Sequence, residues 1–492
     1  MKAILQDRSQ ENANTEIRAT KPGISLAMLL AGSLLVGFSM GRWLAPLAAW
    51  IGPVLIMRYA RDHKVGRGFL LILAANILAI FIGFGGIWVS GLPLPLVPIL
   101  AVSWGLLLSL PYLANRLVGA RLKGFSSTFV YPLAATTLEF VNIRINPMGA
   151  WGATGFTQYG NLPLMQLASV TGMIGITFLM GWFASVANWA WENRSRGGEM
   201  LRGLAAFGAV AAAVFSFGFL RLNLAPSSDT VRVAGITAVS FFETPDIEME
   251  SIRDAYFDAT VREAQAGAKV IVWHELAGMG PASDEASLIA RAQEVARQYG
   301  IYLTIPLGTS YPDTNRPMEN KLLLIDPSGA IVMEHVKYGG NFIEGSLRGD
   351  GMLQTVATPF GVLSGIICWD MDFPAVIQQA GQNGTCLMLV PSADWFEIDP
   401  AHAQMAVFRA IENGMSIVRQ TYGGLSIAVD PYGRVLAQVD FFGSTDRTMV
   451  AQVPVKHVAT VYTAFGRWFE WLCLAGLLYV IARALIARRQ MR

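Results

Sequence analysis

Residues 361–374 read GVLSGIICWDMDFP, and this short stretch decides the fold expected for the polar part of the chain. Its apolar beginning predicts a buried β-strand, and Pro374 suits the first turn of a following helix. Cys368 therefore lies at a strand-to-helix turn, where the helix dipole and free N–H groups favour a thiolate. A cysteine at such a turn can act as a nucleophile.

The chain contains only 3 cysteines, which excludes a disulfide scaffold and a cysteine-rich zinc site. A lone cysteine is often an inert core residue, and we interpret Cys386 and Cys473 in this way. The same interpretation stays open for Cys368, because Asp370 and Asp372 follow it closely and oppose its ionisation. A nucleophilic Cys368 therefore requires a base or a cation nearby.

Outward from this stretch, buried strands and amphipathic helices alternate, which is typical of an α/β domain. The predicted strands are 231–240, 269–273, 301–308, 320–336 (a hairpin turned at Pro327-Ser328-Gly329), 361–368, 385–391, 416–420, 425–430 and 434–440. The predicted helices are 244–267 (N-cap Thr244, then Pro245), 286–300 (closed by Gly300), 373–383 and 400–413.

Two charged residues end predicted strands of this domain. Glu275 ends VIVWHE, and Lys337 follows the strand of EHVKYGG. Each alone would be interpreted as a surface charge. Together with Cys368 they lie at the same ends of buried strands, where the functional site of an open α/β sheet forms.

The composition divides the chain into two parts. Of its 492 residues, 53% are hydrophobic and 15% are charged, whereas a soluble protein has about 25% charged residues. The first 228 residues hold only 7 of the 35 acidic residues, and 27 lie between Asp229 and Asp446. A membrane-embedded half therefore precedes a globular domain of ordinary polarity.

Eight apolar runs approach or reach the roughly 20 residues that cross a bilayer. They are 24–40, 43–57, 69–90, 94–115, 127–143, 163–190, 203–222 and 464–486. Basic residues gather on one side of these runs: Lys2, Arg8, Arg18, Lys21, Arg58, Arg61, Lys64, Arg67, Arg116, Arg121, Lys123, Arg194, Arg196, Arg202, Arg483, Arg488, Arg489 and Arg492. The short loops of the other side hold little beyond Arg42 and Arg144.

Basic short loops stay in the cytoplasm, so we expect both termini inside and the globular domain outside. The predicted organisation is a cytoplasmic segment 1–23, seven spans in 24–222, an external catalytic domain 223–463, an eighth span 464–486 and a cytoplasmic tail 487–492. Glu139 lies in the fifth run. A carboxylate inside a span is a functional candidate by default, and pairing between helices is the alternative.

Several classes of protein are excluded or unsupported. A net charge of +2 argues against nucleic-acid binding. The chain lacks the GxxxxGK[ST] and HExxH patterns of phosphate cradles and zinc hydrolases, and we expect no metal and no organic cofactor. His274, His335 and His402 lack the spacing of metal ligands and are interpreted as structural.

The order of Glu275, Lys337 and Cys368 resembles the Glu-Lys-Cys triad of the nitrilase superfamily. Residues 394–436, DWFEIDPAHAQMAVFRAIENGMSIVRQTYGGLSIAVDPYGRVL, are similar to the C-terminal half of that superfamily. The spans narrow the resemblance to apolipoprotein N-acyltransferases. GRWLAPLAAWIGPVLI resembles their early spans, and Pro132, Glu139, Pro147, GATGFTQ and PLMQLASVTGMIGITFL resemble their fifth and sixth spans.

The resemblance implies a multi-span α-helical membrane bundle plus a nitrilase-like αββα sandwich, in a bacterial inner membrane with the catalytic domain on the periplasmic side. It implies that Glu275 is the general base, that Lys337 stabilises the oxyanion and that Cys368 carries an acyl thioester. The implied partners are a phospholipid acyl donor and a diacylated lipoprotein acceptor. The implied supporting residues are Glu344, Trp369, Asp370, Trp395 and Glu139.

The chain departs from the family pattern around the pocket. His274 replaces a proline, Ser392–Phe396 replaces Asn-Asp-Ala-Trp-Phe, Thr421–Gly423 replaces Asn-Thr-Gly, and the loop from Lys337 to Glu344 is one residue short. These departures leave the substrate open. The alternatives are a membrane-anchored amidase that uses water as the second nucleophile, and a non-catalytic paralogue that binds lipid or lipoprotein. A transporter function is a weaker alternative, because Glu139 is the one candidate charge that lies within the predicted spans.

Overall fold

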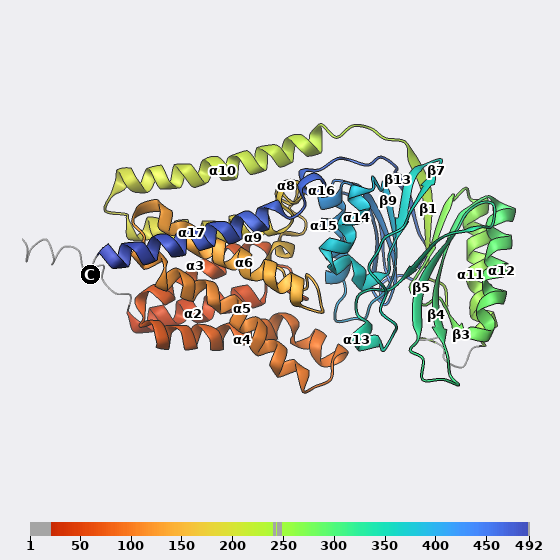
Figure 1. Ribbon diagram of the computed structural model, residues 1–492, viewed down its shortest axis with the longest axis horizontal. Helices are drawn as coiled ribbons and strands as arrows, with labels where there is room; N and C mark the ends of the chain where they lie inside the picture. Colours follow the sequence, from red (N-terminus) through yellow and green to blue (C-terminus); the bar gives the residue numbers. More distant parts are fainter. Residues whose placement is uncertain (1–20, 240–242, 244–247, 491–492) are drawn as a thin grey trace, which may run out of the picture.

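The computed structural model describes residues 21–239, 243 and 248–490. It has a helical half and a half built on two β-sheets (Figure 1). Four of the basic residues that support the expected orientation, Lys2, Arg8, Arg18 and Arg492, lie outside the described residues. The predicted start of helix 244–267, Thr244 and Pro245, also lies outside them.

The two sheets pack face to face. The first has the order β13-β1-β2-β4-β5-β6, with β3 beside β4. Its strands are β1 Thr230–Ile236, β2 Val270–Trp273, β3 Gly278–Pro281, β4 Tyr302–Ser310, β5 Glu319–Ile325, β6 Ile331–Val336 and β13 Met449–Pro454. The second has the order β12-β11-β10-β9-β8-β7. Its strands are β7 Thr355–Thr358, β8 Gly361–Gly365, β9 Leu387–Ala393, β10 Ser416–Tyr422, β11 Leu425–Val429 and β12 Val435–Asp440.

The space between the sheets is filled by aliphatic side chains from both of them. Val272 and Leu324 of the first sheet share a buried core with Leu389 and Val418 of the second. Burying a side chain of this size stabilises the fold by about 1.5–3 kcal/mol. Since β1, β2 and β4 run parallel, as do β8, β9 and β10, each sheet brings several strand ends to one edge.

Helices cover the outer face of each sheet and complete the αββα order (Figure 1). α11 (Met249–Gln265) and α12 (Ala282–Tyr299) pack on the first sheet, where Gly300 ends α12 with a φ of 62°. α14 (Pro374–Gln382) and α15 (Ala401–Asn413) lie between the second sheet and the helical half (Figure 1). The expected sandwich is therefore confirmed.

The helical half contains the apolar runs. Its main helices are α2 Pro22–Gly37, α3 Pro46–Asp62, α4 Val65–Gly91, α5 Leu96–Leu117, α6 Val130–Ile145, α7 Leu162–Met165, α8 Ala168–Thr171, α9 Ile174–Glu192, α10 Gly197–Asn223 and α17 Trp468–Gln490. By length and composition α4, α5, α10 and α17 could each cross a membrane. The pair 162–171 and 174–192, bent by 115°, is a broken span, which would be a fifth, or a re-entrant loop. α2, α3 and α6 have 16 or 17 residues, so the count of eight spans stays a prediction.

Some elements of the sandwich differ from the sequence prediction. The patterns do not predict β3, β7, β13 or the short helices α13 (Asn341–Glu344) and α16 (Val461–Phe465). β13 has six residues and alternates between buried and less buried positions, which is a weak signal, yet it pairs with β1 and joins the end of the domain to its beginning. α11 begins at Met249, after the predicted start of its helix.

α15 joins the two halves. Phe408 packs against Phe156 of the helical half with ring centroids 5.2 Å apart, within one continuous apolar core. Glu412 accepts a hydrogen bond of 2.8 Å from the backbone N–H of Met173, at the bend before α9. Arg409, paired with Glu412, donates to the carbonyl oxygen of Met371 at 3.0 Å. The bent helix is therefore connected through α15 to the segment that follows Cys368.

Candidate active site

Cys368 begins a single 3-10 turn, Cys368–Asp372, directly after β8. Its φ is 46°, in the left-handed region that non-glycine residues rarely adopt. Asp370 stabilises this turn, because its carboxylate accepts hydrogen bonds from the backbone N–H groups of Ile367, Tyr338 and Gly339 at 2.8–3.1 Å. His335 donates to the same carboxylate at 2.7 Å. The predicted turn is present, and Asp370 supports its backbone.

Glu275 and Lys337 meet at the end of the first sheet. Lys337 Nζ lies 2.6 Å from Glu275 Oε1 and also pairs with Glu344. Asn320 donates to the same oxygen of Glu275 at 2.7 Å, and the backbone N–H of Ala393 donates to the other at 2.8 Å. Glu275 and Lys337 are both buried, so their charges interact in surroundings that exclude most water.

The site lies at the edge shared by the two sheets of the expected sandwich, so its strand ends come from both sheets. Glu275 and Lys337 follow β2 and β6 of the first sheet, whereas Cys368 follows β8 of the second. Ala393 at the end of β9 connects them: its N–H binds Glu275, and its carbonyl oxygen lies 3.6 Å from Cys368 Sγ. Parallel strands in each sheet bring these ends to one shared edge.

Burial and neighbouring charges shift the titration of all three residues. Burial raises the pKa of Glu275, against the opposing charge of Lys337, which makes this carboxylate a better proton acceptor. Burial alone would lower the pKa of Lys337, but Glu275, Cys368 and Glu344 raise it, so Lys337 stays cationic. Burial and the charge of Glu275 raise the pKa of Cys368, while His402 and Lys337 lower it.

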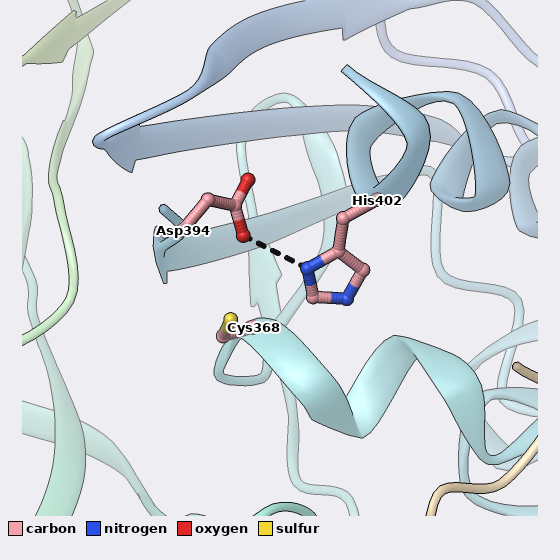
Figure 2. Close-up of side chains that lie close together, drawn as sticks. All are labelled: Cys368, Asp394 and His402. Carbon is pink, nitrogen blue, oxygen red and sulfur yellow. Dashed lines mark hydrogen bonds and ion pairs between the residues drawn. The ribbon is translucent and has the colours of Figure 1, made fainter. Parts of the chain in front are cut away.

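A second cluster, not predicted from the sequence, lies beside the cysteine. Cys368, Asp394 and His402 place ligand-type atoms within 4.8 Å of one another (Figure 2). His402 Nδ1 lies 2.8 Å from Asp394, and Nε2 lies 3.0 Å from Asp372. Arg419 donates to both oxygens of Asp394, at 2.7 and 2.8 Å. A metal at this place would have to displace a buried ion pair, so the residues fit an ionic network better than a metal site.

The interpretation of the three histidines as structural therefore changes for one of them, His402. His335 binds Asp370, and His274 Nδ1 donates to its neighbour's carbonyl oxygen at 2.6 Å. Burial lowers the pKa of His274 to about 4, so it adds no charge beside Glu275. His402 is different, because it faces the sulfur of Cys368. Its distance of 34 positions from Cys368 in sequence hides this relation.

Two predicted tryptophans lie at the junction with the helical half. Trp369 donates to the carbonyl oxygen of Met148 at 3.4 Å, and Trp395 donates to Ser90 at 3.2 Å. Both line a small, mostly apolar pocket together with Trp151. Trp151 also lines a larger, mostly apolar cavity among the helices of the bundle, so apolar space adjoins the site on the side of the helical half.

Glu139 lies in that larger cavity and is not brought to Cys368. Its carboxylate accepts hydrogen bonds from the backbone N–H of Thr154 at 3.0 Å and from the Thr177 hydroxyl at 2.9 Å. These bonds join α6 to α9 and to the turn at 154–158. The geometry fits the pairing alternative for Glu139.

Comparison with known proteins covers both halves of the chain. The model of the carbon-nitrogen hydrolase family matches residues 249–462, and the model of the apolipoprotein N-acyltransferase N-terminal domain matches residues 31–186. The chain belongs to the apolipoprotein N-acyltransferase family. With its long apolar helices, this makes it a membrane-bound acyltransferase of bacterial type.

Relatives named apolipoprotein N-acyltransferase cover most of the chain. The protein of Geobacter metallireducens is 24% identical over 74% of this chain and 75% of its own length. That of Shewanella oneidensis is 24% identical over 80% and 84%. Among solved structures, an amidase from Nesterenkonia sp. is similar at 21% identity and a TM-score of 0.39, covering 47% of this chain and 93% of its own.

Proposed function

We propose that this N-acyltransferase moves an acyl chain from a membrane phospholipid, through a thioester on Cys368, to the N-terminal diacylglyceryl-cysteine amine of a lipoprotein. One observation carries the proposal. A buried cysteine on a strained turn and the Glu275–Lys337 pair are linked through Ala393, and Trp369, next to the cysteine, lines an apolar pocket at the junction with the bundle. The site thus combines a nucleophile, a base and a fixed cation beside lipid-compatible space.

The first step forms the thioester. The Cys368 thiol gives its proton to Glu275, and the thiolate attacks the ester carbonyl of the phospholipid. The tetrahedral oxyanion is stabilised by the ammonium of Lys337. The C–O bond then breaks, and the proton held by Glu275 passes to the leaving lysophospholipid oxygen. Glu344, which pairs with Lys337, and Asp370, which supports the turn, are proposed to position these groups.

The second step transfers the chain to an amine. The lipoprotein α-amine attacks the thioester carbonyl, the C–N bond forms and the C–S bond breaks. The proton leaving the amine is taken by Glu275 and returned to the sulfur. Trp369 and Trp395 are proposed to guide the acyl chain, since both line the cavity at the junction. Both substrates keep their acyl chains in the bilayer while their reacting groups reach Cys368.

We further propose that the membrane is the bacterial inner membrane and that residues 223–463 form a catalytic domain on its outer side. The alternation of basic loops supports this orientation. The connectivity also supports it, because the sandwich lies between α10 and α17, two helices long enough to cross a membrane. The proposed boundaries are those of the sequence prediction: 1–23, 24–222, 223–463, 464–486 and 487–492.

The deciding experiment incubates the purified enzyme with phospholipid and a diacylated lipoprotein, and mass spectrometry follows the lipoprotein. A gain of one acyl chain on its N-terminus supports transfer, and Cys368→Ala is the matched control. Release of free fatty acid without that gain would favour the amidase-like alternative with water as acceptor, for which the carbon-nitrogen hydrolase match is the supporting observation. Failure to form any thioester would favour the binding paralogue.

A further inference from the structure

Four charged residues form a buried network behind Cys368. They are Asp372 of the turn, Asp394 after β9, His402 of α15 and Arg419 of β10, and their side chains are at most 2% exposed. Arg419 binds Asp394 through both Nη atoms, so most of the charge of that carboxylate is balanced within the network. Asp372 has His402 as its ion-pair partner.

Two carboxylates flank the ring of His402. Its Nδ1 lies 2.8 Å from Asp394 and its Nε2 lies 3.0 Å from Asp372, while Arg419, which can only donate, approaches Nδ1 at 3.0 Å. Carboxylates only accept hydrogen bonds, and both nitrogens of a histidine donate only when the ring is an imidazolium. Burial opposes this charge, as does Arg419, but the two carboxylates raise the pKa of His402 well above its usual value.

Charged groups from both sheets act on the Cys368 thiol. Lys337 lowers the pKa of Cys368, but its ammonium is shared between two carboxylates, Glu275 and Glu344. Glu275 itself disfavours the thiolate. Two further cations of the described residues belong to the network. Arg419 is engaged with Asp394, and a ring nitrogen of His402 lies within 4.8 Å of Cys368 Sγ. Figure 2 shows His402 beside Cys368.

We infer that His402 is a positioning residue for the nucleophile: held as an imidazolium by Asp372 and Asp394, it provides the cation that favours the Cys368 thiolate. It acts as a fixed charge, and Glu275 remains the base. The inference rests on the proposed function only in taking Cys368 as the nucleophile. It predicts that a substitution of His402 changes the ionisation of the Cys368 thiol even when no lipid is bound.

The test measures the rate of Cys368 alkylation by iodoacetamide against pH, in the full-length enzyme in detergent with Cys386 and Cys473 replaced by serine. In His402→Gln the midpoint of the rate profile should move up by about one pH unit, since an opposite charge nearby typically shifts a thiol by that much. At pH 7 the alkylation should be roughly tenfold slower. His402→Lys, which keeps a charge, should recover part of the shift.

His457→Gln is the control, because His457 Nδ1 hydrogen-bonds to the backbone carbonyl oxygen of Thr385, at the opposite end of β9 from Asp394. Its midpoint should stay at the wild-type value. If His402→Gln does not fold, His402→Asn carries the same expectation. A folded variant at position 402 with an unchanged midpoint overturns the inference. Alkylation needs neither phospholipid nor lipoprotein, so its outcome is independent of the acyl-transfer experiment.

Discussion

Glu275 accepts a hydrogen bond of 2.8 Å from the backbone N–H of Ala393, which ties the end of one sheet to the end of the other. The carbonyl oxygen of Ala393 lies 3.6 Å from Cys368 Sγ. One residue of β9 therefore contacts both the proposed base and the proposed nucleophile. This arrangement makes the chemistry sensitive to the packing of the two sheets.

Cys368→Ser should abolish thioester formation and acyl transfer, because a serine hydroxyl at this turn is far less ionised than a thiol. Cys386→Ser and Cys473→Ser should keep both. Cys386 donates to the carbonyl oxygen of Val362 at 3.1 Å and Cys473 packs among the helices, both away from the site. Intact-protein mass spectrometry after incubation with phospholipid checks this, and acyl-enzyme on the Cys368→Ser protein would refute the assignment.

Glu275→Gln and Lys337→Met should impair different parts of the reaction. Loss of a general base costs about 10²–10⁴-fold, and Glu275→Gln should slow both thioester formation and amine attack. Loss of one oxyanion-stabilising group costs roughly 10²–10³-fold in kcat, with little change in substrate binding. Lys337→Arg should not rescue, because a guanidinium cannot occupy the place of the ammonium between Glu275 and Glu344.

Single-turnover accumulation of thioester from a fluorescent phospholipid separates these variants. Lys321→Met is a suitable control, since Lys321 pairs with Glu285 and Glu319 rather than with the site. Near-normal thioester formation in Lys337→Met would remove the lysine from the chemistry.

Glu139→Gln should lower stability more than activity. The carboxylate joins α6 to α9 through Thr177 and to Thr154, and hydrogen bonds to a charged group contribute about 1.5–3 kcal/mol each. We expect a lower melting temperature in detergent and thioester formation within about threefold of wild type at 20 °C, a change of under 1 kcal/mol in the barrier. A stable variant without thioester would instead give Glu139 a functional role.

The network at His402 predicts a pH-dependent contribution to stability. The raised pKa of His402 means that its contribution is complete below the unfolded value of about 6.5 and is lost as pH rises through the folded pKa. Arg419 and His402 lower the pKa of Asp394 against the effect of its burial. The contribution of Asp394 to stability is therefore present above the unfolded pKa of about 3.9 and is lost as pH falls below it. The melting-temperature difference between wild type and His402→Gln should therefore shrink from pH 6 to pH 9, and a constant difference would contradict the charged state of His402.

Topology can be tested with a reporter that is active only outside the cytoplasm. Fused after Ala225, behind α10, it should be active, and fused after Lys64, behind α3, it should be silent. The reverse pattern would overturn the proposed orientation.

The local patterns of the chain were enough to predict most elements of the sandwich and the turn at Cys368. Strands such as Val270–Trp273 and Leu387–Ala393 are continuous apolar runs, and the helix Ala282–Tyr299 ends at a glycine with positive φ. Each of these features arises from neighbouring residues, through periodicity and capping. Composition and basic loops likewise separate a membrane half from a polar half, because bilayer and water select different side chains.

The remaining features depend on residues far apart in sequence. Nothing near Cys368 reveals that β8 lies in a different sheet from β2, or that Asp394 and His402 lie beside its sulfur. Because α2, α3 and α6 are shorter than a typical span, the number of membrane crossings also depends on how the bundle packs. Such relations follow from how sheets and helices pack, since the energy of a buried charge depends on partners that only the folded chain brings within a few ångströms of one another.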